Sequence, residues 1–483
     1  MRHDTTLPDE TLSNATASAT PLATCLVVVW STQPGECGRV ILVPPQEGGL
    51  PYTIGRGEQS PEDTQARLLP QEDRPGPERR AVPLTSPRIS RAQLLVAIGE
   101  DGTLTVTNIG KATLRHNDVA VERVSVRPGD TLQLGRQVLL LCVQRPAWQG
   151  AMRPGFRFHS FGTPDASGLC GESAVMWKIR EELEFVARQT GHVLVCGPSG
   201  TGKELLARAI HRLSSRGQKI LVSRNASTFP ETLIDAELFG NMKNYPNPGM
   251  PERLGIFGEA AGSSLFLDEL AELPQPLQTH LLRVLDQGEF QRLGEGRTRV
   301  ADVRLIGATN RPAALRADLA ARFKLQIHSP GLEERREDIP LLVHAIVRGI
   351  AASTPNTALR FFHDEKLEGE PRVAIELMRS LVLRGYQAHF RELEGILWQC
   401  VQRSTGTVLE MHSERERDVE MPRPMSTHAT EEGTAATVSI APQRIEEVLV
   451  QHDWVVERAW RDLGLSSRHV LTRLIARHRL RRP

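Results

Sequence analysis

The sequence predicts a multidomain chain in which an all-β sandwich, an α/β domain and a small all-α unit follow one another. Short apolar runs separated by Gly, Pro and Asp turns fill residues 22–145, as in antiparallel sandwiches. Near residue 200 an apolar strand leads through a glycine-rich turn into an amphipathic helix, which is typical of a parallel α/β sheet. Beyond residue 441 three amphipathic helical patterns surround a glycine turn. The 483 residues leave room for about three domains.

The apolar runs of the first region each have the length of a strand and end at turn residues. The expected strands are Leu26–Trp30, Arg39–Val43, Leu94–Ile98, Leu104–Val106 and Val138–Val143. Between them, the segment 58–83 is rich in Pro, Glu, Gln and Arg, a composition typical of a mobile loop. We therefore expect a β-sandwich with one long loop.

The glycine-rich turn of the second region has the composition of a phosphate-binding loop. Glycine lets backbone N–H groups curl around phosphate oxygens, and a lysine adds a point charge for the outer phosphates. The expected nucleotide-binding residues are Gly197, Pro198, Ser199, Gly200, Thr201, Gly202, Lys203 and Glu204. A chance glycine-rich turn is the alternative, but the strand before it and the helix after it favour phosphate binding. Glu204 stands where Ser or Thr usually holds magnesium.

A second apolar strand, residues 265–267, ends in two acids, Asp268 and Glu269. A nucleotide hydrolase needs such a pair, because one carboxylate holds Mg²⁺ through water and the other activates the attacking water. The alternative is a helix that begins with two acids. The interval of about 70 residues from the phosphate loop favours a three-layer α/β ATPase.

Further motifs follow in one order along residues 169–403. They are Glu237–Gly240, Leu281–Leu285, Gly288–Phe290, Ala308–Arg311, Glu337–Pro340 and Arg391–Glu394. With the phosphate loop and the acidic pair, they resemble the AAA+ ATPase domain of bacterial enhancer-binding proteins, the sigma-54-dependent transcription activators. In that family the phosphate loop ends in Lys-Glu, which accounts for Glu204. The resemblance implies an AAA+ core over residues 166–340, a helical lid over 341–410, ATP and Mg²⁺ as cofactors, and assembly into dimers to hexamers.

The resemblance also implies a role for each matching residue. Lys203 contacts the β- and γ-phosphates, Asp268 holds Mg²⁺ and Glu269 is the catalytic base. The other roles fall on Asn225, which restrains the base, on Thr309 and Asn310 of the first sensor, on the arginine fingers Arg316 and Arg322, and on Arg391 of the second sensor. A guanidinium suits a finger that reaches a neighbouring subunit's γ-phosphate, because its charge is permanent and its donors fork onto oxygens. For any single arginine, a solvated surface role is the alternative.

One loop departs from the family. Where enhancer-binding proteins carry the GAFTGA motif that touches sigma-54, this chain has Asn244–Gly249, with Pro246 and Asn247 in place of the contacting Phe and Thr. Two prolines fix φ and remove two N–H donors, so the loop is stiffened. Two interpretations are equally open. The loop either no longer contacts sigma-54 or contacts it in a changed way. A sigma-54-independent regulator is therefore an alternative function.

Three landmarks stand out in the β-rich region, residues 22–145. They are Thr53–Arg56, Ile89–Arg91 and Pro128–Gly135. They resemble a forkhead-associated (FHA) domain, a β-sandwich that binds phosphothreonine. By position, Arg56 and Ser90 hold the phosphate, Arg91 adds charge, and Thr113 stands near the asparagine that grips the ligand backbone; a guanidinium plus a hydroxyl suits a dianion. Gln93 replaces the histidine that braces the pocket, so the alternative is a sandwich that has lost its ligand.

The composition of the last region predicts a linker followed by a basic helical unit. A Pro-, Glu-, Thr- and Ser-rich stretch, residues 411–440, is a linker by composition. Within residues 441–483, Leu463–Ser466 forms the turn before a basic helix, and this arrangement resembles the Fis-type helix-turn-helix domain. The residues expected to contact DNA are Ser467, Arg468, His469, Thr472 and Arg473. A terminal helix that only packs is the alternative.

The composition carries no strong bulk charge. The formal net charge is +1, so any contact with DNA must come from a local basic region. The six cysteines form no CxxC pair and are expected to be free thiols in a reducing compartment. No apolar run is long enough for a membrane span and no signal-peptide layout is present, so we expect a cytoplasmic protein.

Together these observations predict a DNA-binding transcriptional regulator of the sigma-54 activator type, which hydrolyses ATP and is gated by phosphothreonine recognition. The expected partners are an upstream activating DNA sequence, RNA polymerase with sigma-54, a phosphothreonine protein and further copies of the chain. The first alternative is a sigma-54-independent regulator. The second is a non-catalytic, phosphopeptide-gated DNA binder, which the intact Lys203, Asp268 and Glu269 disfavour.

Overall fold

The computed structural model divides the chain into two compact units, Met1–Met421 and Pro422–Pro483. The structure describes residues 22–45, 50–61, 63–76, 79–99, 101–146, 156, 158–230, 232–363, 367, 369–411 and 448–452. In the second unit, residues 448–451 are helical. The rest of the predicted linker and of the helix-turn-helix, including all five predicted DNA-contacting residues, lies outside the described residues.

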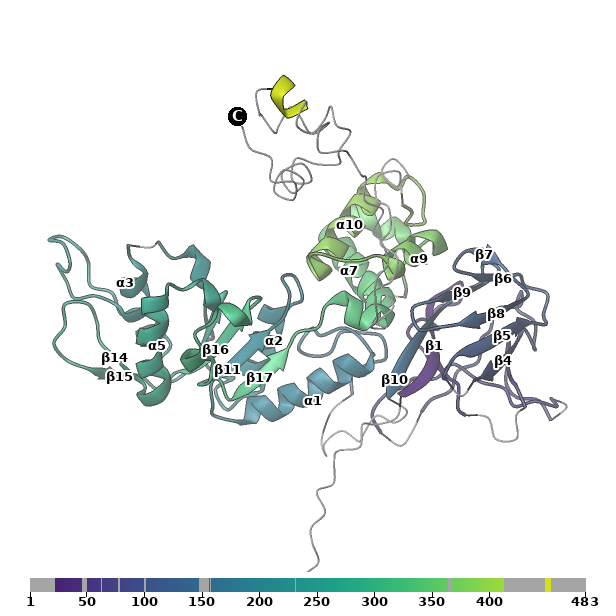
Figure 1. Cartoon of the computed structure of the whole chain (residues 1–483), viewed down its shortest axis with the longest axis horizontal. Coiled ribbons are helices and arrows are strands. Elements are labelled where there is room, and N and C mark those ends of the chain that lie inside the picture. The colour runs from purple at the N-terminus through teal and green to yellow at the C-terminus, as the bar shows by residue number, and fades with distance from the viewer. Residues whose placement is uncertain are drawn as a thin grey trace, which may run out of the picture. The chain divides into compact units, whose positions relative to one another are not determined.

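The N-terminal region consists of two antiparallel sheets over one apolar core (Figure 1). The six strands of the first sheet, in spatial order, are β2 (Val40–Leu42), β1 (Leu22–Ser31), β10 (Val138–Pro146), β9 (Thr131–Leu134), β6 (Leu114–His116) and β7 (Val119–Ala120). The second sheet runs in the order β3 (Tyr52–Ile54), β4 (Leu94–Ile98), β5 (Leu104–Asn108) and β8 (Arg123–Val126). The all-β prediction for this region is confirmed, and each expected strand overlaps an observed one.

The central pair of strands in the first sheet is buried on both faces. Side chains alternate along a strand, so Leu26 and Val28 of β1 point into the core of the sandwich. Val27 and Val29 point the other way, into a second core that also contains Leu341 of the helical lid. This two-sided burial explains why these strands are continuous apolar runs rather than alternating ones.

The segment 58–83, expected to be a mobile loop, is instead tied to the sandwich, and that prediction is wrong. Its described residues form β-bridges with the strands, among them Val40 with Gln71 and Thr53 with Arg67. The segment also carries Asp73, whose side chain is buried. Composition missed this because the bonds are made by backbone groups, which any residue type except proline can supply.

The central domain is a three-layer α/β fold around a parallel sheet. In spatial order its strands are β12 (Val222–Asn225), β13 (Ser264–Asp268), β16 (Arg304–Thr309), β11 (Val193–Cys196) and β17 (Leu325–His328). One face packs on α1 (Ala174–Arg188) and α2 (Lys203–Leu213), the other on α3 (Ile234–Phe239), α4 (Ile256–Glu259) and α5 (Gln275–Gln287). Strand β13 contributes to both faces of the sheet. Leu265 and Leu267 pack against α3, α4 and α5, whereas Phe266 packs against α1 and α2. The predicted α/β architecture is confirmed.

Short elements complete this domain, and helices follow it. The short elements are η1 (Ala226–Thr228), η2 (Leu270–Glu272), β14 (Glu289–Phe290), β15 (Arg299–Val300), η3 (Pro312–Ala314), α6 (Ala317–Ala320) and η4 (Leu332–Asp338). The helical lid consists of α7 (Ile339–Ser353), α8 (Pro355–Ala358), η5 (Leu359–Phe361), α9 (Ile375–Leu383) and α10 (His389–Arg403). Each described helix is too short or too polar to cross a bilayer.

A buried arginine joins the sandwich to the central α/β domain. The Arg145 side chain, on β10, is only 2% exposed. It donates to Asp73 Oδ2 at 2.7 Å, to Glu337 Oε2 at 3.0 Å and to the backbone oxygen of Glu172 at 2.9 Å. Burial raises the pKa of the Glu337 carboxyl, and the Arg145 guanidinium opposes that shift. One cation therefore neutralises carboxylates from both sides of this junction.

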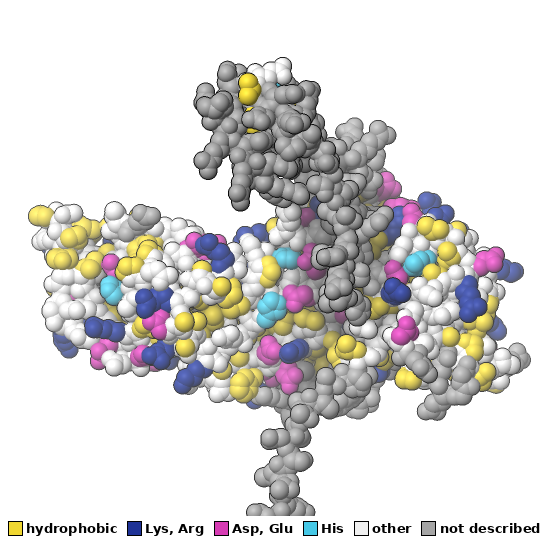
Figure 2. All heavy atoms as spheres, in the orientation of Figure 1, with side chains coloured by type: hydrophobic (Ala, Val, Ile, Leu, Met, Phe, Trp, Pro, Cys, Tyr) yellow, Lys and Arg dark blue, Asp and Glu magenta, His cyan; other side chains and the backbone are white. Residues whose placement is uncertain are grey.

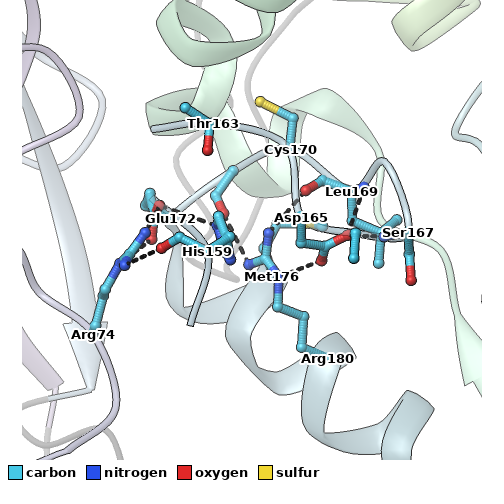
Figure 3. A network of polar contacts seen from close by, with 12 residues as sticks. Arg74, His159, Thr163, Asp165, Ser167, Leu169, Cys170, Glu172, Met176 and Arg180 are labelled. Atoms are coloured by element: carbon cyan, nitrogen blue, oxygen red, sulfur yellow. Dashed lines mark hydrogen bonds and ion pairs between the residues drawn. The ribbon is translucent and has the colours of Figure 1, made fainter. Parts of the chain in front are cut away.

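A second group of charged side chains holds the segment that precedes α1 (Figure 3). Arg74 Nε donates to Glu172 Oε2 at 3.0 Å, and its Nη1 donates to the backbone oxygen of His159 at 2.8 Å. Arg180 of α1 donates to Asp165 Oδ2 at 2.9 Å. The segment between the two domains is thus held by side chains of both.

Replacing Arg145 by Met keeps most of its bulk but leaves two buried carboxylates without the guanidinium that joins them. We expect a loss of about 3–5 kcal/mol in stability, because removing one partner from a buried network of charges is strongly destabilising. Urea unfolding followed by circular dichroism measures this. The control is Arg136→Ala, which breaks the Arg136–Glu376 pair between the sandwich and the lid, where the Arg136 side chain is 82% exposed. Equal urea midpoints for the two variants would show that Arg145 is not the main electrostatic tie.

Candidate nucleotide site

A cavity of about 720 Å³ lies between the phosphate-binding loop and the helical lid. Its polar lining residues are Ser199, Gly200, Thr201, Gly202, Lys203, Glu204, Asp268, Glu269, Asn310, Arg335 and Arg391. Apolar residues also line it, among them Leu169, Cys170, Met176, Ile179, Leu342 and Ile346. A cavity lined by both charged and apolar groups has the character of a nucleotide site.

The phosphate-binding loop connects β11 to α2, as predicted, and α2 begins at Lys203. The first N–H groups of a helix have no partner within it, so they are available to an anion. Lys203 Nζ donates to the backbone oxygens of Gly197 at 3.0 Å and Pro198 at 2.9 Å, which holds the ammonium over its own loop. Burial lowers the pKa of Lys203, and the nearby Asp268 opposes this shift.

The acidic pair is at the carboxyl end of β13. The backbone N–H of Glu269 donates to Asp268 Oδ1 at 2.9 Å. Glu269 has φ of 53°, in the left-handed region that non-glycine residues rarely adopt. Burial raises the pKa of Asp268, whereas the Glu269 N–H and Lys203 lower it. The sheet therefore brings the two carboxylates to the same edge as the lysine.

The lid touches the phosphate-binding loop directly. The backbone N–H of Phe390, near the start of α10, donates to the oxygen of Gly200 at 3.0 Å. A Cβ atom at Gly200 would lie 2.1 Å from the backbone oxygen of Ala388, so this position requires glycine. Arg391 follows on the same helix and lines the cavity. The contact sets how closely Arg391 approaches the loop.

The three other residues assigned to the active site by position lie at different depths. Asn310 lines the cavity, but Thr309 is fully buried and its Oγ1 accepts a hydrogen bond from the N–H of Arg311 at 3.0 Å. Asn225 pairs with Asp268 across the sheet, and its side chain caps η1 through the N–H of Ser227 at 2.9 Å. The described contacts of Asn225 therefore hold the next turn and do not reach the Glu269 side chain.

The two arginines assigned as fingers lie away from this cavity. Arg316 Nη2 is 2.6 Å from Asp318 Oδ2, and Arg322 Nε is 2.7 Å from Asp286 Oδ1. Both side chains are at least a third exposed. They are accessible on the surface of the chain that carries them, as a residue acting on a neighbouring subunit must be.

The loop that replaces GAFTGA is folded back on itself. The buried Asn241 side chain donates through Nδ2 to the backbone oxygens of Met242 at 3.0 Å, Tyr245 at 3.1 Å and Pro251 at 2.9 Å. These bonds join the beginning and the end of the loop. Tyr245 itself remains 44% exposed. Asn241 was not singled out from the sequence, because an isolated asparagine carries no signal of such a role.

The predicted phosphopeptide pocket is assembled around Gln93. Arg56 donates its backbone N–H to the oxygen of Ser90 at 3.0 Å, and Ser90 Oγ accepts from the N–H of Lys111 at 3.0 Å. The buried Gln93 side chain accepts from the N–H of Ser90 at 3.0 Å and donates to the oxygen of Ala112 at 2.9 Å. Gln93 therefore braces the Ser90 loop, the role expected of the missing histidine.

The other pocket residues have different environments. Arg56 Nε is buried and has no hydrogen-bond partner among the described residues. Arg91 and Thr113 are exposed. The sequence did not point to Asn108, whose Oδ1 accepts from Gln93 Nε2 at 2.7 Å and completes the brace.

Charge is distributed evenly over the visible surface. Figure 2 shows basic and acidic side chains interspersed over the described part of the face it draws. This pattern agrees with the near-zero net charge of +1.

The chain matches the family described as Sigma-54 interaction domain over residues 169–326. It is 35% identical over 322 residues to the formate hydrogenlyase transcriptional activator FhlA of Escherichia coli, covering 63% of this chain and 44% of that protein. It is 34% identical over 321 residues to the Nif-specific regulatory protein of Azotobacter vinelandii, covering 63% and 58%. The transcriptional regulatory protein ZraR of Salmonella typhimurium is 34% identical over 316 residues, covering 64% of this chain and 68% of ZraR.

The chain spans less than half the length of FhlA, so it corresponds to only part of that relative. Among solved structures, NtrX from Brucella abortus in complex with ATP is 27% identical, with a TM-score of 0.43. That alignment covers 65% of this chain and 69% of the NtrX chain.

Proposed function

The chain belongs to the family of transcriptional regulators that carry a Sigma-54 interaction domain, and from this premise we propose that it is an ATP-hydrolysing regulator of transcription. We assign ATP hydrolysis to the central domain, phosphothreonine recognition to the N-terminal sandwich and DNA binding to the C-terminal region. These three assignments follow the order of the predicted domains along the chain.

The convergence of Lys203, Asp268, Asn310 and Arg391 on one cavity carries the proposal. The residues fit a magnesium nucleotide. Lysine and helix N–H groups suit the phosphates, and carboxylate oxygens are the ligands that Mg²⁺ prefers. The apolar residues that line the same cavity suit the base of the nucleotide.

Hydrolysis needs a base beside the terminal phosphate, and Glu269 is the candidate. Asp268 would hold Mg²⁺, which neutralises charge on the phosphate oxygens when bound. Glu269 orients the attacking water and accepts its proton, and Lys203 stabilises the charge that develops on the phosphate. The unusual backbone angle of Glu269 fixes the direction in which its carboxylate leaves the strand.

We propose that hydrolysis requires a neighbouring copy of the chain. Arg316 and Arg322 are outside the cavity of their own chain, and each is held at the surface by an aspartate. An arginine supplied by a neighbour would complete the phosphate site, as an arginine finger does. A dimer or a larger ring, up to a hexamer, supplies this geometry.

The sandwich is proposed to receive the signal. The free Nε of Arg56 and the hydroxyl of Ser90 lie on adjoining segments, and a guanidinium beside a hydroxyl is a typical phosphate-binding pair. The brace from Gln93 keeps the Ser90 loop in place. The ligand would be a phosphothreonine segment of a protein partner.

For the output, we propose binding to an upstream DNA site through Ser467, Arg468, His469, Thr472 and Arg473, and action on RNA polymerase with sigma-54. The folded-back loop Asn244–Gly249 favours a second candidate, a DNA-bound ATPase that acts without sigma-54. Asn241, just before that loop, donates hydrogen bonds to Tyr245 within it and to Pro251 after it. These bonds restrain the loop from extending towards a partner. Both candidates share a cytoplasmic location.

Transcription from a sigma-54 promoter with purified components tests the function. The wild-type chain is expected to hydrolyse ATP with Mg²⁺ and to activate the promoter. Glu269→Gln is expected to bind ATP with unchanged affinity but to lose turnover and activation, since only the base is removed. Arg299→Ala, an exposed arginine paired with Glu295, is the control and should behave like wild type. ATP turnover without activation would support the sigma-54-independent candidate, and unchanged turnover in Glu269→Gln would contradict the assignment of the base.

Mixing two inactive variants tests the shared site. Lys203→Ala removes the phosphate lysine and Arg322→Ala removes a finger, so each protein alone is expected to have little ATPase activity. In a mixture some interfaces combine an intact Lys203 with an intact Arg322, and part of the activity should return. Steady-state phosphate release measures it. A mixture no more active than its components would count against a finger supplied by the neighbour.

Arg56→Ala tests the input. Wild-type protein is expected to bind a phosphothreonine peptide in preference to the unphosphorylated peptide, measured by fluorescence anisotropy. Arg56→Ala should remove that preference, because the dianion loses its forked donor. The control is Arg115→Ala, an exposed arginine of the same sandwich. Equal, weak binding of both peptides by the wild-type protein would mean that the sandwich is a scaffold.

A further inference from the structure

We propose that Cys37, His344 and Glu370 form a binding site for a zinc-like divalent metal ion that joins the sandwich to the helical lid. One thiol, one imidazole and one carboxylate of these residues place their ligand atoms all within 4.8 Å of one another. Cys37 follows β1 in the sandwich, His344 is on α7, and Glu370 precedes α9 in the lid. The site is separate from the nucleotide cavity and does not depend on the proposed function.

The imidazole of His344 is the second observation that points to a ligand. The residue is 7% exposed, and no hydrogen bond or ion pair joins its ring to any residue that the structure describes. A ring nitrogen that bonds to none of the described protein groups has a free electron pair. A metal ion would accept the free electron pair of one ring nitrogen.

The set of ligands selects the class of metal. Sulfur, nitrogen and a single carboxylate oxygen are the ligands of Zn²⁺ and of chemically similar ions, whereas Ca²⁺ and Mg²⁺ prefer oxygen alone. Around tetrahedral zinc the ligand atoms lie about 3.3–3.6 Å apart, so side-chain rotations that close the present separation by up to about 1.5 Å would complete the geometry. Three protein ligands leave the fourth position to water.

The neighbouring bonds already hold the two sides of the site together. The N–H of Gly35 donates to Glu370 Oε1 at 2.9 Å, which aims the carboxylate at the Cys37 turn. The indole N–H of Trp30, on β1, donates to the oxygen of Val373 at 2.7 Å. Because the ligands come from two domains, a bound ion would stabilise their docked arrangement.

The metal would also stiffen one wall of the nucleotide cavity. Leu342 and Ile346 of α7 line that cavity, and His344 is on the same helix between them. An ion held by His344 would therefore restrict the movement of α7 relative to the sandwich. Metal binding would couple the position of the lid to that of the sandwich.

Cobalt titration of the chelator-treated full-length chain tests the site, since tetrahedral Co²⁺ bound to a thiolate absorbs in the near ultraviolet. We expect one equivalent of Co²⁺ to bind with a thiolate-to-metal band and to be displaced by one equivalent of Zn²⁺, with zinc content confirmed by mass spectrometry. Cys37→Ser should abolish the band, and Glu370→Gln should weaken binding by about 10–100-fold, the range typical of perturbed metal sites. Cys400→Ser, a buried thiol of α10 outside the site, is the matched control and should keep the band.

Two outcomes would overturn the proposal. One is an absence of stoichiometric binding by the folded wild-type chain, which would make the three residues a packed cluster only. The other is a thiolate band that survives in Cys37→Ser, which would place the metal on another cysteine. If Cys37→Ser does not fold, Glu370→Gln decides, because its carboxylate is only partly buried and the amide keeps its shape.

Discussion

The apolar core of the helical lid is the interaction on which the rest of the structure depends. Residues of α7, α9 and α10 pack in it together with the outward-facing side chains of β1 and β10. Strands β1 and β10 are therefore buried on both faces, and the lid is stabilised by contacts from outside the α/β domain. Because burial of apolar area is the main favourable term in folding, this shared core ties the three parts together more strongly than any single polar bond.

The polar groups at the same junction make the docking specific. Arg145 sits among Asp73, Glu337 and the backbone of Glu172, which come from both sides. A buried charge is stable only where its partners are in reach, so this network favours the docked position of the two domains. Apolar packing alone would allow neighbouring positions with similar energy.

The contacts of the sheet and the lid determine where the residues of the candidate nucleotide site lie. The parallel sheet places the loop before α2 and the end of β13 at one edge, which brings Lys203 and Asp268 together. The lid closes the cavity from the other side, and the bond from Phe390 to Gly200 sets the distance. A change in the sandwich can thus reach the cavity through the lid, because the lid contacts both the sandwich core and the loop before α2.

The sequence by itself determined the local features of this protein. Periodicity and turn residues predicted the β-rich region, the α/β domain and the phosphate-binding loop, because strands and loops are specified by residues close together in the chain. The positions of Lys203, Asp268, Asn310 and Arg391 in one cavity also follow from motifs in a known order. The roles of Gln93 and Asn241 did not follow, since each depends on hydrogen bonds to backbone groups that no pattern marks. Only the tertiary structure decided that the segment 58–83 is bound to the sandwich, that Arg145 is buried, and that Cys37 meets His344 and Glu370. Those residues are up to hundreds of positions apart, and their contacts exist only after distant segments have packed together.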